Sequence, residues 1–233
     1  MSKTEQFACE DVYLDYQSAK PVDPRVISKM LPYFNEQFGN PSSLHGTGDA
    51  ATNILEESRE MIAKFINAKP SEIIFTSSAT ESNNLALIGY ALRNKKKGNH
   101  IIISEVEHIS IHNIAKYLTR QGFEVSKVPV DSYGRIILRK LKARIRPETI
   151  LVSIGYASNE IGTLQPIKEI GKITRENDIA FHVDAVSAEG LIPIDVEQDD
   201  IDLLSLSSND IYGPRGVGAL YLRKGYRVKP LLI

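Results

Sequence analysis

Short runs of β-branched and apolar residues alternate with longer amphipathic segments along most of this chain. This alternation is typical of βαβ units, in which helices connect parallel strands and cover both faces of a sheet. Strands are expected at Val12 to Asp15, Glu72 to Phe75, His100 to Ser104, Glu124 to Val128, Thr149 to Ile154, Ala180 to Val183, Leu203 to Leu206 and Gly218 to Leu222. Helices are expected at Pro24 to Asn35, Gly48 to Asn67, Glu81 to Lys96, Ser110 to Gln121, Ile136 to Ile145 and Ile167 to Asn177. We therefore predict an α/β domain with a mainly parallel sheet flanked by helices over residues 12–233, after a polar lead at residues 1–11.

Charge and cysteine content narrow the class of protein. The chain has 28 Lys plus Arg against 29 Asp plus Glu, so neither nucleic acid nor an anionic membrane is an expected partner. No apolar run approaches the ~20 residues of a membrane span, and the N-terminus lacks the apolar core of a secretory signal. A cytoplasmic protein is expected. The only cysteine, Cys9, excludes an internal disulfide and is expected to be an idle thiol, and the histidines show no metal-ligand spacing.

A turn rich in hydroxyl groups, Phe75-Thr-Ser-Ser-Ala-Thr-Glu-Ser-Asn-Asn84, lies between a predicted strand and a predicted helix. Backbone N–H groups at a helix start, together with the hydroxyls of Ser78 and Thr80, make a site suited to phosphate. The alternative is that Ser78 or Thr80 only caps the helix.

Polar side chains also follow three of the predicted strands. His108 and Asn159 come shortly after strands, and Asp184 ends the apolar run Phe181-His-Val-Asp. Ligands of open α/β sheets bind at the carboxyl ends of the strands. A carboxylate there is costly to bury unless a cation faces it, which favours a site at Asp184. For His108 a helix cap, and for Asn159 a loop turn, remain alternatives.

The segment from Ser205 to Leu220 is similar to the pyridoxal 5'-phosphate (PLP) loop of cysteine desulfurases, in the class V aminotransferase group. That loop runs approximately Ser-x-His-Lys-x-x-Gly-Pro-x-Gly-x-Gly. Here Asn209 takes the histidine slot and Asp210 takes the slot of the lysine, whose amine forms the Schiff base with the cofactor aldehyde. A carboxylate cannot replace an amine in this covalent chemistry.

Other motifs extend the resemblance from Tyr13 to about Leu222 and imply the large domain of a PLP-dependent transferase of fold type I. The family binds PLP phosphate through the turn that contains Ala79 and Thr80. His108 matches the ring that stacks on the cofactor and assists proton transfer, Asn159 the contact to the ring oxygen, and Asp184 the carboxylate that keeps the pyridine nitrogen protonated.

Three matched positions show smaller changes or none. Ser207 keeps a phosphate-binding hydroxyl. Ser187 stands where many desulfurases have a glutamine against the ring oxygen, and Ser78 replaces a glycine of the turn. Cofactor-binding roles are thus implied for Ser187, Ser207 and Asn209, and catalytic roles for His108 and for Asp210, whose carboxylate could accept a proton.

The resemblance implies PLP-dependent sulfur transfer from L-cysteine for iron–sulfur cluster assembly, by a homodimer with an iron–sulfur scaffold protein as partner. With Asp210 in place of the lysine, PLP would be bound without a covalent link and activity would be impaired. The small C-terminal domain of the family, which supplies a mobile cysteine, is expected to be absent. Two alternatives stay open, namely a noncatalytic scaffold or partner protein in cluster assembly and a truncated product without function.

This chain has a lysine, Lys20, near the position where the family's Schiff-base lysine is missing. Lys20 occupies a usual threonine position of the family motif at the mouth of the active site. We expect Lys20 and Asp210 to form an ion pair, because each would otherwise be a partly buried unpaired charge. The alternative is that Lys20 points into solvent.

The predicted helix Gly48 to Asn67 has one apolar face. Ile54, Leu55, Met61, Ile62, Phe65 and Ile66 fall near this face, with charged residues opposite them. Such a pattern predicts packing against the core and no other role.

Overall fold

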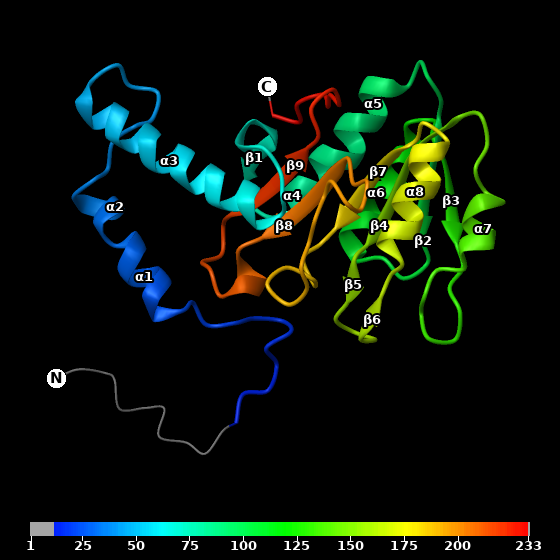
Figure 1. Cartoon of the computed structure of the whole chain (residues 1–233), viewed down its shortest axis with the longest axis horizontal. Coiled ribbons are helices and arrows are strands. Elements are labelled where there is room, and N and C mark those ends of the chain that lie inside the picture. The colour runs from blue at the N-terminus through cyan, green and yellow to red at the C-terminus, as the bar shows by residue number, and fades with distance from the viewer. Residues whose placement is uncertain (1–11, 233) are drawn as a thin grey trace.

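The computed structural model describes residues 12–232, so the predicted polar lead at residues 1–11 and its Cys9 lie outside the described residues. Figure 1 shows a central sheet with helices on both faces and a helical segment that projects from one side. The described part contains no helix long and apolar enough to cross a membrane.

A seven-stranded sheet forms the centre of the domain, in the order β1-β9-β8-β7-β4-β2-β3. Its strands are β1 (Ile73–Thr76), β2 (His100–Ser104), β3 (Glu124–Val128), β4 (Thr149–Gly155), β7 (Ala180–Asp184), β8 (Leu203–Ser207) and β9 (Gly218–Leu222). Strand β9 runs antiparallel to both of its neighbours, and the other paired strands run parallel. The predicted mainly parallel sheet is confirmed.

The core lies on both faces of this sheet. Ile101 and Ile103 of β2 belong to one cluster of buried residues, and Ile102 between them belongs to the other. This division follows from the pleat, since successive side chains of a strand point to opposite faces. Because helices cover both faces, β2, β4, β7 and β8 are almost wholly buried, as expected for parallel strands of this kind.

Helices cover the two faces. On one face lie α4 (Ala79–Asn84), α5 (Tyr90–Asn94) and α6 (Ile109–Arg120), whose buried residues include Tyr90, Ile111 and Leu118. On the other face lie α7 (Leu138–Lys142), α8 (Ile167–Glu176) and the end of α3 (Gly46–Phe65). Short 3-10 turns occupy Pro70–Glu72 (η1) and Asn209–Ile211 (η3).

Several predicted boundaries need correction. The helix expected at Pro24 to Asn35 is two helices, α1 (Pro24–Met30) and α2 (Pro32–Asn35), because Pro32 has no N–H to continue the first. A π-helical turn, Leu85–Gly89 (η2), joins α4 to α5 within the expected helix Glu81 to Lys96. The small hairpin of β5 (Ala157–Ser158) and β6 (Thr163–Leu164) was not predicted.

The strand predicted at Val12 to Asp15 is wrong. In the described chain these residues pair with no strand, and Val12 and Leu14 are 77% and 84% exposed. An apolar run becomes a strand only where a neighbouring strand and a covered face are available to it.

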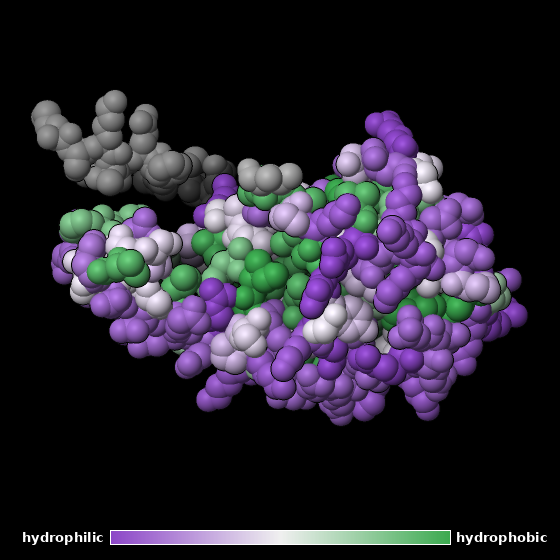
Figure 2. All heavy atoms as spheres, turned by 90° about the horizontal axis from the view of Figure 1, so that it is seen from above, coloured by the Kyte–Doolittle hydropathy of each residue, from purple (hydrophilic) through white to green (hydrophobic). Residues whose placement is uncertain are grey.

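The helix α3 leaves the sheet along most of its length (Figure 1). Only its end packs against the core, through Ala63 and the following Ile66, whereas Met61 is 64% and Phe65 43% exposed. The prediction that the whole apolar face packs into the core is therefore wrong, because the helix projects beyond the sheet. Figure 2 shows apolar side chains on the surface of the part of the molecule that projects beyond the sheet.

Candidate functional site

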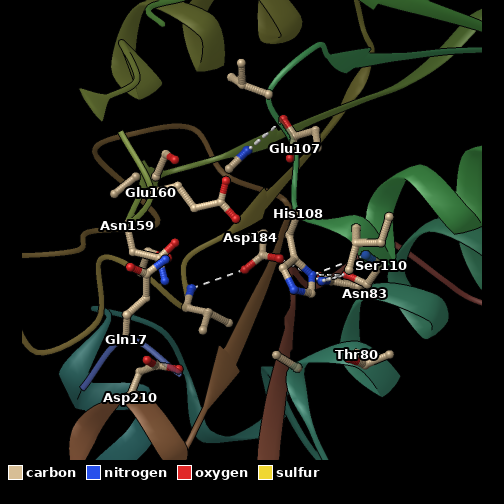
Figure 3. Close-up of a pocket in the computed structure, with 18 residues that line it drawn as sticks. Gln17, Thr80, Asn83, Glu107, His108, Ser110, Asn159, Glu160, Asp184 and Asp210 are labelled. Carbon is tan, nitrogen blue, oxygen red and sulfur yellow. Dashed lines mark hydrogen bonds between the residues drawn. The ribbon is translucent and has the colours of Figure 1, made fainter. Parts of the chain in front are cut away.

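A cavity of about 320 Å³ lies at the carboxyl ends of β4 and β7. Its lining comes from the start of α4, the loop after β2, the loop around the β5–β6 hairpin, the segment after β7, and two distant residues, Gln17 and Asp210 (Figure 3). Parallel strands end at one edge of the sheet, so side chains that are remote in sequence meet there.

Most residues proposed from the sequence line this one cavity. They are Ala79, Thr80, His108, Asn159, Asp184, Ser187 and Asp210. Two others lie beside it: Ser207 is buried at the end of β8, where its hydroxyl accepts from the Asn209 N–H at 3.3 Å, and Asn209 lines a neighbouring cavity together with Lys20. The roles of Ser207 and Asn209 therefore stay predictions.

Asp184 is the most enclosed carboxyl group of the lining, with 8% of the residue exposed. Asn83 Nδ2 donates to its Oδ2 at 2.7 Å, and the Val186 N–H donates to its Oδ1 at 3.2 Å. Burial raises the pKa of Asp184, and the Asn83 and Val186 hydrogen bonds oppose this increase. A cationic hydrogen-bond donor in the cavity would therefore stabilise the ionised form of Asp184.

A hydrogen-bonded chain holds His108 in place. Its Nδ1 accepts from the Ser110 N–H at 3.2 Å and lies 2.8 Å from Ser110 Oγ, whose hydroxyl can then donate to it. The same Oγ accepts from Asn83 Nδ2 at 3.2 Å. This network places the proton of the neutral ring on Nε2. His108 also caps α6, so the helix-cap alternative and a place in the lining hold together.

Glu107 was not predicted as a site residue, although it precedes His108 in the same motif. Its Oε1 accepts from the Gly155 N–H at 3.1 Å, while its buried Oε2 has no partner among the described residues. Burial raises the pKa of Glu107 to about 8, so the group is mostly neutral at pH 7. The Oδ1 of Asn83 is likewise buried without a partner in the described chain. Unpaired polar atoms beside a cavity indicate a polar ligand.

Lys20 and Asp210 form the ion pair that the sequence predicts. Lys20 Nζ lies 3.6 Å from Asp210 Oδ1 and donates to the Asp210 backbone carbonyl at 2.7 Å. The ammonium group also lies 5.5 Å from the centre of the Tyr212 ring. With 18% of its side chain exposed, Lys20 does not point into solvent, and that alternative is wrong.

A second buried carboxyl group, Glu189, supports the loop behind the cavity and was also not predicted. Its two oxygens accept from the Ser207 N–H at 3.0 and 3.2 Å. Burial raises the pKa of Glu189 to about 9, and so it is neutral at pH 7. Only the fold reveals this residue, because no spacing in the sequence links Glu189 to Ser207.

The start of α4 combines a helix cap with a close approach of two segments. Ser78 Oγ accepts from the Glu81 N–H at 3.2 Å, so Ser78 caps the helix as its alternative interpretation proposed. A side chain at Gly218 would meet the Ser78 backbone carbon at 2.6 Å, which explains the glycine in β9. Thr80 lies beyond the cap and lines the cavity.

The lining has polar groups that suit a PLP-type cofactor, but it lacks the amine for the covalent link. A buried acceptor at Asp184 suits a protonated ring nitrogen, and unpaired polar atoms at Asn83 and Glu107 suit a polar ligand. In place of the amine needed for the link, the cavity has the carboxylate of Asp210.

The fold and the cavity define a protein of the PLP-dependent fold type I class, and residues 12–233 match the family "Aminotransferase class-V", to which the chain belongs. Within it the chain resembles cysteine desulfurases. It is 55% identical to "Cysteine desulfurase IscS 1" of Archaeoglobus fulgidus, over 95% of this chain and 58% of that relative. It is 52% identical to "Cysteine desulfurase IscS" of Neisseria gonorrhoeae, over 94% of this chain and 54% of that one.

Solved structures give the same result. A "NIFS-LIKE PROTEIN" matches with a TM-score of 0.92 at 41% identity, over 95% of this chain and 61% of that structure. "SspA in complex with cysteine" matches with a TM-score of 0.92 at 40% identity, over 95% and 65%. The predicted family and fold are confirmed, and the chain spans less than two thirds of the length of these relatives.

Proposed function

We propose that this domain belongs to a desulfurase-type system for sulfur transfer from L-cysteine, that it binds PLP reversibly, and that by itself it releases little or no sulfur. The observation that carries the proposal is the carboxylate of Asp210, which lines the cavity at the place of the family's lysine. A lysine-based covalent link needs an amine that can lose its proton. Lys20 holds this carboxylate from outside the cavity instead.

The chain's own residues would hold the cofactor, which when bound supplies an electron sink for chemistry at the substrate amino acid. Asp184 would accept from the ring nitrogen, and Asn159 and Ser187 would face the ring oxygen. Ala79, Thr80, Ser207 and Asn209 would bind the phosphate. Support comes from the shared cavity for most of them.

His108 would act on protons next to the ring. Ser110 Oγ lies 2.8 Å from His108 Nδ1 and accepts from Asn83 Nδ2 at 3.2 Å, and this arrangement would leave Nε2 as the nitrogen that exchanges a proton with a ligand. The names of the relatives support L-cysteine as the substrate and, by extension, an iron–sulfur scaffold protein as a partner. The cytoplasmic location stays a prediction.

Binding of PLP without a covalent link is testable on the intact chain. We expect PLP to quench the protein's tyrosine fluorescence saturably and to leave on gel filtration, and borohydride treatment to leave no pyridoxyl group on the peptides that line the cavity. Sulfide release from L-cysteine is expected at the level of a control without protein. A pyridoxyl group found on a cavity residue after reduction, or sulfide released by the chain alone, would contradict the proposal. Saturable binding without sulfide release would also suit the second candidate, a noncatalytic partner in cluster assembly.

The segment formed by residues 24–65, which we term the projecting arm, supports a homodimer. It carries apolar side chains on its surface: Phe34 is 72% exposed, Phe38 70% and Leu44 fully exposed. Isolated exposed apolar residues are common, but a group of them on one projecting element is typical of a protein contact. We propose that a second copy of the chain covers the arm.

Light scattering coupled to gel filtration tests this contact. We expect the wild type to have twice the mass of one chain and the double variant Phe34→Lys, Phe38→Lys to have the mass of one chain, because two buried charges would face apolar surface. The control Tyr133→Lys changes a residue that is 81% exposed outside the arm and should leave the mass unchanged. A wild type with the mass of one chain would remove the proposal.

A further inference from the structure

The described lining of the cavity is acidic and contains no lysine or arginine. Four carboxyl groups belong to it, those of Glu107, Glu160, Asp184 and Asp210, and His108 is the only basic side chain among the described lining residues. Burial raises the pKa of Glu107 to about 8 and also raises the pKa of Asp184. Such a lining favours a ligand with positive charge near the carboxylates.

Asp210 stands between Lys20 and the cavity. It lines the cavity itself, whereas Lys20 lines the neighbouring one on the other side. The short contact of Lys20 Nζ, at 2.7 Å, is to the backbone carbonyl, and the distance to Oδ1 is 3.6 Å, beyond a hydrogen bond. A carboxylate has about four acceptor positions. The ion pair therefore leaves Asp210 able to accept hydrogen bonds from a ligand.

The identity of residue 210 decides which form of the cofactor the cavity prefers. In the resembling enzymes the lysine at this position bonds to the carbon that carries the aldehyde, so Asp210 is placed toward the same carbon of a bound ligand. An aldehyde offers a carboxylate only a partly negative oxygen. A primary ammonium on this carbon would form a charge-assisted hydrogen bond with it, of the kind that is about twice as strong as a neutral one.

We propose that the cavity is a site for the amine form of the cofactor, pyridoxamine 5'-phosphate, in preference to the aldehyde form. This inference rests on the proposed cofactor site. The two ligands share the ring nitrogen, the ring oxygen and the phosphate, so contacts from Asp184, Asn159 and Thr80 contribute to both. The difference in affinity isolates residue 210 and its partner Lys20.

Calorimetric titration at pH 7.5 with three ligands tests the preference. Pyridoxine 5'-phosphate carries a neutral hydroxyl on the same carbon and cannot form an imine with surface lysines, so it is the reference for pyridoxamine 5'-phosphate, and PLP is the third ligand. For the wild type we expect pyridoxamine 5'-phosphate to bind at least about tenfold more tightly than the reference, as a hydrogen bond to a charged group predicts.

Variants on either side of the ion pair should move this ratio in opposite directions. Asp210→Asn removes the charge at nearly constant shape and should bring the ratio close to one, while affinity for the reference changes by about twofold at most. Lys20→Met removes the cation that competes for Asp210 and should raise the ratio. The control Asp49→Asn removes an exposed carboxylate of α3 outside the lining and should change the ratio by about twofold at most.

The results separate this inference from the proposed function. If all three ligands bind the wild type with equal affinity, the preference for an amine is overturned while the cofactor site stands. If the ratio persists in Asp210→Asn, the assignment to Asp210 is overturned. If none of the ligands binds, the proposed cofactor site fails and this inference fails with it.

Discussion

The substitution Asp210→Lys is expected to convert reversible binding of PLP into covalent attachment at residue 210. The residue already lines the cavity, so an amine there can reach the cofactor carbon that the family's lysine reaches. Lys20 increases the effect, because its ammonium group, 3.6 Å from the present carboxylate, would lower the pKa of the introduced amine and favour its nucleophilic form. Borohydride reduction followed by peptide mass mapping should find the pyridoxyl group on the peptide that contains residue 210.

Two matched variants make this result specific. Asp210→Asn removes the carboxylate without adding an amine and should give no adduct at the site. The double variant Asp210→Lys, Lys20→Thr should form the adduct with a higher pH midpoint than the single variant, because the neighbouring cation is gone. If Asp210→Lys binds PLP reversibly but gains no adduct, residue 210 does not reach the cofactor carbon, and the amine preference loses its basis as well.

Much of the fold follows from the sequence because its central strands are buried on both faces. Runs such as Ile101 to Ile103 of β2 are apolar because both of their faces are covered, and this makes them recognisable from the sequence alone. Val12 to Asp15 is equally apolar in pattern, yet it pairs with no described strand. The exposed Met61 shows the same limit for a helix, since an apolar face predicts a contact without saying which surface supplies it.

The candidate site was predictable where a side chain belongs to a motif and unpredictable where only packing recruits it. Asp184 ends a strand and His108 and Asp210 come shortly after strands, and the structure brings the three together. Glu189 has no such signal: it matters because β8 places the Ser207 N–H against its carboxyl group. The Lys20–Asp210 pair lies between these cases, since two unusual residues predicted a contact over 190 positions that only the fold could confirm.

Asp210, Lys20 and Glu189 lie close enough to influence one another electrostatically. Asp210 would place a negative charge next to Glu189, which burial keeps neutral, and Lys20 balances this charge from the other side. Lys20 thus compensates the charge of Asp210, while Asn83, Glu107 and Asp184 give the cavity polar groups that suit a cofactor.

The substitution Asp184→Asn should weaken binding of PLP or of its amine form by between about 10-fold and 150-fold, the range for a hydrogen bond to a charged group. The variant keeps an oxygen that can accept from Asn83 Nδ2, now at 2.7 Å, so the local geometry should persist. What it loses is the charge that faces a protonated ring nitrogen. Titration by fluorescence measures the change, and Asp49→Asn, on the surface of α3, serves as the control with unchanged affinity.

The substitution Asp184→Asn should leave the free energy of unfolding of the ligand-free protein unchanged or raise it. Burial raises the pKa of Asp184, so the folded state holds this proton more readily than the unfolded chain, and the carboxylate costs stability as pH rises through that folded pKa. Without ligand, Asp184→Asn should therefore unfold in urea at the same or a higher concentration than the wild type at pH 8. A variant that is less stable and binds equally well would mean that Asp184 supports the fold and not the cofactor. The expected result, weaker binding with no loss of stability, would mark Asp184 as a charge that the fold tolerates because a ligand compensates it.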